Sequence, residues 1–190
     1  MSYSKNHVDV LVEIRGWHKF RLTGIYGEPN RARREETWDL LRSLNTMEDI
    51  PWVLIGDMNN VLKQADKKGG NPYPHRMLDG FQSVLDDYNL HDVNLEGYQF
   101  TWERGHGTSN WIEVRLDRAL VSGNFIQQFN EKKLTNLEHL DITQDIRSSF
   151  GICSRICIRI VEIATGPYHQ RIAGRLAISI SPTAHLEVDD

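Results

Sequence analysis

The chain has 190 residues, enough for one domain with a sizeable core and too few for two domains of ordinary size. Its net charge of -4 and its 39% hydrophobic content are typical of a soluble globular protein, and they exclude overall attraction to a polyanion, although a local basic patch can still bind one. No apolar run approaches the roughly 18 residues of a membrane span and no signal-peptide pattern opens the chain, so we expect an intracellular protein.

The first part of the chain predicts a β-hairpin followed by a helix. Apolar residues alternate over residues 8–14 and again over residues 20–26, with a turn around Gly16 between them. Breaker residues follow Tyr26, and Asn30 can cap a helix that the apolar periodicity predicts over residues 31–47.

Three arginines, Arg31, Arg33 and Arg34, crowd the first turn of this predicted helix. Cations at a helix N-terminus oppose the helix dipole, so contact with a phosphate would explain them. A solvated helix face with an Arg31/Glu35 ion pair is the alternative, and the sequence leaves both open.

The apolar run from Trp52 to Ile55 predicts a short buried strand that ends in Gly56, Asp57 and Asn59. We expect Gly56 to let the strand end turn sharply and to admit a close ligand. In extended geometry residues i and i+2 point the same way, so Asp57 and Asn59 can converge on one bound group. A carboxylate beside a carboxamide suits a water to be activated and an anion to be held. The alternative is an Asx turn in which both side chains cap the backbone.

Several further elements are predicted downstream. A polar loop over residues 63–74 contains Lys67 and Lys68, and the apolar spacing between Met77 and Tyr88 predicts an amphipathic helix. The other predicted elements are a strand over residues 98–102, an exposed loop over 105–110, an apolar segment over 112–121, a short helical turn over 124–129 and a strand over 132–137.

Asp117 lies within the apolar segment, between Arg115 and Arg118. Taken alone, an aspartate in this setting is most often part of a structural ion pair.

From about His139 the periodicity weakens, so we divide the chain into a domain over residues 1–138 and a divergent tail over 139–190, for which poor order is one expectation. Cys153 and Cys157 have no second Cys/His pair at a metal-binding spacing, and we interpret them as reduced thiols.

Four motifs in order carry a family resemblance: Tyr26-Gly27, the GDMN string at 56–59, FTW at 100–102 and RLDRAL at 115–120. Together they resemble the endonuclease/exonuclease/phosphatase (DNase I-like) superfamily, and within it the endonuclease region of plant LINE-type retrotransposon polyproteins. The resemblance covers about residues 4–138. It implies an α/β fold, here an incomplete DNase I-like two-sheet sandwich flanked by helices.

The resemblance also implies a chemistry, the Mg²⁺-dependent hydrolysis of phosphate esters by in-line attack of water. Asp57 would help to activate the water and Asn59 would hold a phosphate oxygen. Tyr26 would contact the phosphate, and Asp117 would orient a catalytic histidine. Nucleic acid would be contacted by the basic residues Arg31, Arg33, Arg34, Lys67 and Lys68.

The departures from the family pattern are also informative. The family's early asparagine and metal-binding glutamate have no match, and we therefore expect an N-terminally truncated domain. Where the family has Ser-Asp-His, about 25 residues after the RLD aspartate, this chain reads Ile142-Thr143-Gln144.

The resulting hypothesis is a catalytically impaired remnant of a LINE-type DNA endonuclease, with weak DNA contact, doubtful retention of Mg²⁺ and the nucleus as one candidate location. An active endonuclease or phosphatase of the same superfamily, or a non-catalytic nucleic-acid-binding module, are the alternatives.

Overall fold

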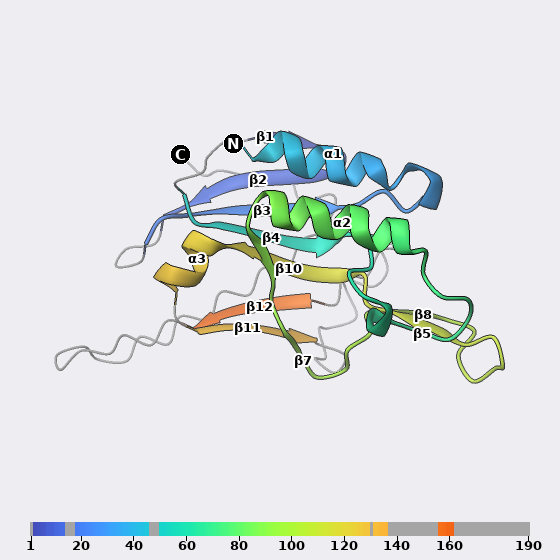
Figure 1. Ribbon diagram of the computed structural model, residues 1–190. Coiled ribbons are helices and arrows are strands. Elements are labelled where there is room, and N and C mark those ends of the chain that lie inside the picture. Colours follow the sequence, from blue (N-terminus) through green and yellow to red (C-terminus); the bar gives the residue numbers. More distant parts are fainter. Residues whose placement is uncertain (1, 14–17, 46–49, 130, 137–155, 162–190) are drawn as a thin grey trace.

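The computed structural model describes residues 2–13, 18–45, 50–129, 131–136 and 156–161 (Figure 1). Its largest sheet has six strands in the order β1-β2-β3-β4-β10-β6. Their bounds are β1 Ser2–Ser4, β2 His7–Val12, β3 Phe20–Tyr26, β4 Trp52–Asp57, β6 Leu90–Asp92 and β10 Asp117–Ser122. The antiparallel pair β2–β3 confirms the predicted hairpin.

β4 lies in the interior of this sheet, parallel to β3 and antiparallel to β10. Its side chains alternate between two apolar clusters: Val53 and Ile55 belong to one, whereas Trp52 and Leu54 belong to the other. A strand buried on both faces needs apolar residues at every position. This explains why its sequence is a continuous apolar run, and the strand extends two residues beyond the predicted end to include Asp57.

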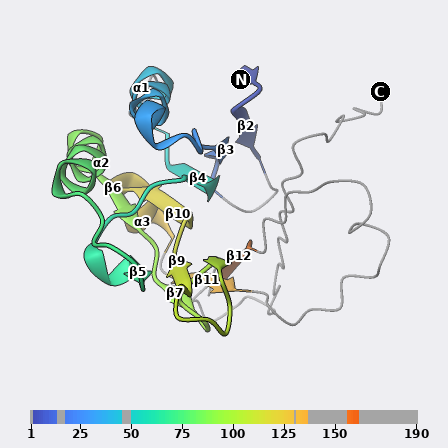
Figure 2. The same ribbon diagram turned by 90° about the vertical axis from the view of Figure 1, so that its right-hand side faces the viewer.

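Two helices, α1 Glu35–Leu44 and α2 His75–Asp87, cover one face of the main sheet (Figures 1 and 2). Both are amphipathic. Their buried residues join the cluster on this face, which includes Trp38, Leu41, Phe81, Val84 and Leu85. A 3₁₀ turn, η1 Arg31–Arg33, precedes α1, so the predicted helix over 31–47 begins with a tighter turn. As predicted, Asn30 caps that turn, because its Oδ1 accepts a hydrogen bond from the Ala32 N–H.

The opposite face of the sheet packs on the short helix α3 Gly123–Gln128 and the residue that follows it. Phe20 from β3 meets Phe125 and Phe129 edge-on, with ring centroids 5.9 and 5.7 Å away. The predicted helical turn after the RLDRAL segment is thus confirmed, and its aromatic residues complete the second core.

Two three-stranded sheets accompany the main one, in the orders β5-β9-β8 and β12-β11-β7. Their strands are β5 Lys67–Lys68, β7 Leu95–Glu96, β8 Trp102–Arg104, β9 Ile112–Val114, β11 Glu131–Asn136 and β12 Ile156–Val161. A second 3₁₀ turn, η2 Gln64–Asp66, leads directly into β5.

The whole is a mixed α/β fold with sheets and flanking helices, as predicted. The predicted strand over 98–102 is wrong, because residues 97–101 are irregular and β8 begins only at Trp102. Within the predicted tail, β12 pairs antiparallel with β11. Residues 139–155 and 162–190 lie outside the described residues, so the division into two parts stays a prediction. No helix in the described part of the chain is long and apolar enough to cross a membrane.

Candidate active site at the ends of β3, β4 and β10

Three of the predicted catalytic residues form one row across the main sheet. The parallel register of β3 and β4 places Tyr26 beside Asp57, and the antiparallel register of β4 and β10 places Asp117 on the other side of Asp57. Tyr26 and Asp57 end their strands and Asp117 begins its own. The sheet therefore brings a phenol and two carboxylates together where these three neighbouring strands end or begin.

Two glycines allow the backbones of β3 and β4 to approach each other closely at this end of the sheet. Gly56 has a φ of +141°, and a Cβ there would lie 2.0 Å from the carbonyl oxygen of Ile25. It lies within β4 and the strand does not turn there, so the expected sharp turn at Gly56 is wrong; its role is to let β3 approach. Gly27 donates its N–H to the carbonyl of Asp57 at 2.7 Å, and a Cβ there would lie 2.2 Å from the Met58 oxygen.

Asn59 joins the row by a route that differs from the predicted one. Its φ of 50° is left-handed, so the chain is not extended between Asp57 and Asn59. Its backbone N–H donates to Asp57 Oδ1 at 2.8 Å, which is the Asx turn of the alternative interpretation. Its side-chain Nδ2 donates to the Gly27 carbonyl at 2.9 Å, and the Asn59 side chain acts to lower the pKa of Tyr26. The left-handed turn at Asn59, and not an extended chain, thus brings Asn59 to the Asp57 carboxylate.

The electrostatics of the row favour a proton on Asp57. Burial, followed by the charge of Asp117, raises the pKa of Asp57 to about 6, against the lowering effects of the Asn59 hydrogen bonds and the Arg34 charge. Burial and the charges of Asp57 and Glu28 raise the pKa of Tyr26 as well. Close carboxylates in a partly dry site disfavour one another's charge. Such a site is poised to exchange a proton near neutral pH and to attract a cation.

Asp117 is 6% exposed, and burial raises its pKa. Among the described residues its Oδ1 has no hydrogen-bond partner. Thr101, which sequence reasoning did not single out, accepts hydrogen bonds on its Oγ1 from the N–H groups of Leu116 and Asp117, both at 3.0 Å. Thr101 also acts to lower the pKa of the Asp117 carboxyl, against the larger effect of burial. The FTW motif contained this residue, and its contacts explain a threonine there.

The arginines that flank Asp117 do not pair with it, so the ion-pair interpretation of Asp117 is wrong. Arg118, fully buried, donates to Asp66 Oδ2 at 2.5 Å and to Asp92 Oδ2 at 2.8 Å. Arg115 donates to the other oxygen of Asp92 at 3.1 Å. This network ties η2 and β6 to β10 and leaves the Asp117 carboxylate for the site.

The five basic residues predicted to contact nucleic acid have different surroundings. Arg33 forms an ion pair with Glu36 at 2.7 Å, and Lys68 forms one with the buried Glu113 at 2.8 Å. Lys67 donates to the Asn71 carbonyl at 2.8 Å and also to the Gly69 carbonyl.

Arg31 and Arg34 instead lie against the ring of Tyr73. The Arg31/Glu35 pair does not form among the described residues; Glu35 is 3.8 Å from Arg76.

A model of the Endonuclease/Exonuclease/phosphatase family matches residues 4–132, a span that contains the whole row of site residues. The chain belongs to this family. No curated protein matches it. Among solved structures it is similar to the endonuclease domain of TRAS1, a telomere-specific non-LTR retrotransposon, with 20% identity and a TM-score of 0.51 over 69% of this chain. The chain spans 57% of that domain, and the likeness supports the fold predicted from the motifs.

Beta toxin from Staphylococcus aureus also matches this endonuclease/exonuclease/phosphatase chain. A double mutant with bound magnesium ions is 17% identical, with a TM-score of 0.46, and covers 70% of this chain and 47% of its own. In this chain, the described residues contain no group of three or more His, Cys, Asp or Glu that could hold a metal ion. The carboxylates of Asp57 and Asp117 and the carboxamide of Asn59 provide oxygen atoms at the site that could bind a metal ion.

Proposed function

We propose that the site at Asp57 acts on the phosphodiester bonds of DNA with the help of Mg²⁺, as the endonuclease of a LINE-type retroelement. We propose further that the 190-residue chain by itself is catalytically impaired. The observation that carries the proposal is the single row of Tyr26, Asp57 and Asp117 across three adjacent strands, with Asn59 hydrogen-bonded to Asp57 and to the Gly27 carbonyl next to Tyr26.

Each residue of the row has a role that its surroundings support. Asp57, with its pKa of about 6, can accept a proton from water near neutral pH. The amide of Asn59 and the phenol of Tyr26 are donors that can stabilise charge on a phosphate oxygen. Asp117 lies beside Asp57, and its negative charge raises the pKa of Asp57.

The donor set fits Mg²⁺, which prefers oxygen ligands and is usually held by one or two carboxylates together with waters and substrate phosphates. Asp57 and Asp117 would hold it, and the unpartnered Oδ1 of Asp117 is a candidate ligand atom. Bound Mg²⁺ would polarise a phosphoryl oxygen.

The impairment is proposed from the sequence. The chain reads Ile142-Thr143-Gln144 where the family has Ser-Asp-His. A charge-orienting partner lowers a reaction barrier by several kcal/mol. We therefore expect DNA binding with little turnover from the 190-residue chain.

The test is nicking of supercoiled plasmid by the purified chain in Mg²⁺ or Mn²⁺. The chain, Asp57→Ala and the control Asp87→Ala are compared; Asp87 is exposed at the end of α2. We expect nicking at or just above background, with any measurable activity lost in Asp57→Ala and kept in the control. Robust nicking that is lost in Asp57→Ala would refute the proposed impairment and would support the assignment of the active site to Asp57.

Robust nicking that Asp57→Ala leaves intact would refute the assignment of the site. Rapid hydrolysis of a soluble phosphate monoester without plasmid nicking would instead favour the phosphatase alternative.

A further inference from the structure

Two neighbouring asparagines follow β4, and their side chains have different partners. Asn59 lies at the site, whereas Asn60 is fully buried. The Nδ2 of Asn60 donates to the Met58 carbonyl at 2.7 Å, and its Oδ1 accepts the indole N–H of Trp38 at 3.1 Å. Asn60 therefore ties the backbone just before Asn59 to helix α1.

The bond from Asn60 to the Met58 carbonyl bears directly on the site. That carbonyl and the N–H of Asn59 belong to one peptide group, which is planar and trans, so the two point in opposite directions. Asn60 binds the carbonyl, and the Asp57 carboxylate accepts the N–H at 2.8 Å. A rotation of this peptide that breaks one bond also breaks the other. Asn60 thus orients the donor that holds Asp57.

The indole that binds Asn60 has little freedom to move. Trp38 is 8% exposed and packs in one apolar cluster with Leu41 and Phe81. Gly80 of α2 lies so close that a Cβ there would be 2.4 Å from the indole ring. Close packing of this kind keeps a side chain in one orientation. The Asn60 carboxamide is therefore held in turn by a fixed donor.

The residue before Trp38 holds the loop that follows β3. Thr37 is 2% exposed, and its Oγ1 accepts the N–H of Glu28 at 2.8 Å. Glu28 follows Gly27, whose carbonyl accepts the side-chain Nδ2 of Asn59 at 2.9 Å. Consecutive residues of α1 thus hold the two loops that follow β3 and β4, and Asn59 bridges those loops.

We propose that Asn60, held by Trp38, is a positioning residue of the site: it fixes the Met58–Asn59 peptide and, through that peptide, the Asp57 carboxylate. The inference rests on the proposed function and adds two buried residues to it. A carboxylate with one oxygen already held loses less freedom when the other oxygen binds a metal ion. Removal of a group that orients a metal ligand typically lowers metal affinity by about 10–100-fold.

The first measurement is the position of the Asn59 backbone amide proton in the NMR spectrum of the full chain, without metal. A hydrogen bond to a carboxylate moves an amide proton downfield. The variants are Asn60→Ala and the milder Trp38→Phe, which keeps an aromatic ring and removes the indole N–H. We expect the resonance to move upfield in both. In the double variant it should move no further than in Asn60→Ala, because both residues act through one chain of hydrogen bonds.

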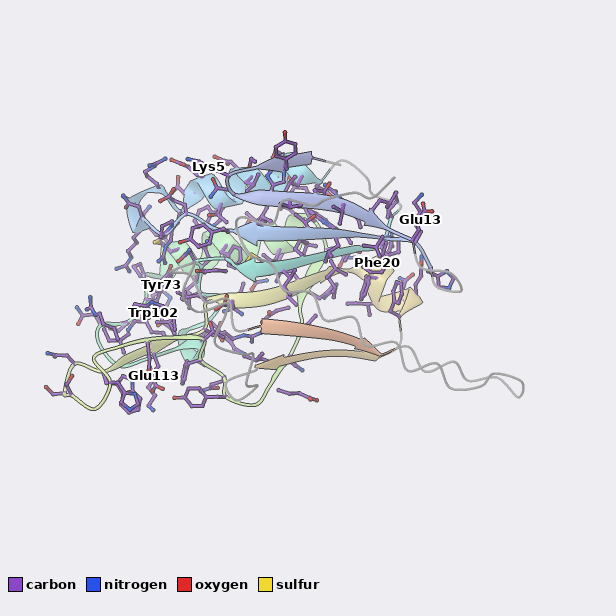
Figure 3. All side chains as sticks on the ribbon, turned by 180° about the vertical axis from the view of Figure 1, so that it is seen from behind. Lys5, Glu13, Phe20, Tyr73, Trp102 and Glu113 are labelled. Carbon is purple, nitrogen blue, oxygen red and sulfur yellow. The ribbon has the colours of Figure 1, made fainter. Side chains whose placement is uncertain are left out.

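Trp52→Phe is the matched control. Trp52 belongs to the same apolar cluster as Trp38, and its indole N–H donates to Thr23 Oγ1 at 2.7 Å. It begins β4, at the end of the main sheet where Figure 3 labels Phe20, opposite the end beside Tyr73. The control therefore removes an equivalent buried indole bond far from the site, and the amide resonance should not move.

The second measurement is the binding of Mn²⁺ alone, followed by the EPR signal of the free ion. We expect Asn60→Ala and Trp38→Phe to weaken binding by about tenfold, because the Asp57 carboxylate is no longer held in place. Trp52→Phe should bind Mn²⁺ as the unaltered chain does.

An Asn59 resonance that stays in place in Asn60→Ala and Trp38→Phe, or that moves as far in Trp52→Phe, would overturn the inference. A shifted resonance with unaltered Mn²⁺ binding would overturn it as well. A failure of the proposed function has a different outcome: the unaltered chain would bind no Mn²⁺, or would bind it equally well after Asp57→Ala. The resonance would then still decide whether Asn60 fixes the peptide.

Discussion

The ionised carboxylate of Asp57 should destabilise the fold at neutral pH. Its pKa is raised from 3.8 to about 6, first by burial and then by Asp117. The folded chain therefore binds more protons than the unfolded chain between about pH 4 and pH 6, and stability falls as pH rises through that window. The shift corresponds to at most about 3 kcal/mol, a loss that is complete above pH 6.

Asp57→Asn removes the charge and keeps the oxygen that accepts the Asn59 N–H at 2.8 Å. We expect the variant to be more stable than the unaltered chain at pH 7, by up to about 3 kcal/mol, and to lose most of the fall in stability between pH 4 and pH 6. Urea unfolding followed by tryptophan fluorescence across pH 4 to 8 gives both quantities. A charged residue that lowers the stability of the fold, and whose neutralisation raises that stability, is expected at a functional site.

Asp66→Asn is the matched control, since it also removes a carboxylate of low exposure. Asp66 is paired with the fully buried Arg118 at 2.5 Å, and loss of one member of a buried pair typically destabilises by about 3–5 kcal/mol. The two variants should thus shift stability in opposite directions at pH 7. If Asp57→Asn destabilises like Asp66→Asn, or leaves the pH dependence intact, the electrostatic account of the site is wrong.

Further predictions concern the contacts that shape the site. Gly56→Ala should prevent or severely weaken folding, because its Cβ would meet the Ile25 carbonyl oxygen at 2.0 Å; soluble yield and thermal melting test this, and a normal melt would contradict it. Thr101→Val should destabilise by about 1–3 kcal/mol in urea unfolding, because two N–H groups lose their acceptor; Thr101→Ser should keep most of the stability. Trp38→Phe should lower stability by about 1 kcal/mol through loss of the bond from its Nε1 to Asn60 Oδ1 at 3.1 Å, and a loss above about 3 kcal/mol would point to packing as its main role.

The sequence by itself determined the elements whose pattern is local. Alternation predicted β2 and β3, the continuous apolar run predicted β4, and helical spacing predicted α1 and α2. These patterns can be recognised because each element buries its own face at its own period. The same local reasoning failed just before Trp102. The aromatic residues there are typical of a strand, but the chain is irregular because its conformation depends on partners elsewhere.

The motifs also indicated the family, since their order along the chain was informative without any knowledge of their contacts. The match over residues 4–132 confirms that family, whereas the assigned roles of Tyr26, Asp57, Asn59 and Asp117 stay predictions.

Only the tertiary structure decided how the site residues meet. Tyr26, Asp57 and Asp117 share a row because of the register of three strands that are distant in sequence, and register depends on long-range pairing. Asn59 reaches the Gly27 carbonyl, just beyond the end of β3, through a left-handed turn, whereas local reasoning assumed an extended chain.

The same limit applies to charge. The sequence marks Arg31, Arg33, Arg34, Lys67 and Lys68 as equally basic, and the fold alone neutralises some with carboxylates and gathers two on Tyr73. Electrostatic partners are chosen by distance in space, and distance in space is what a linear sequence does not contain.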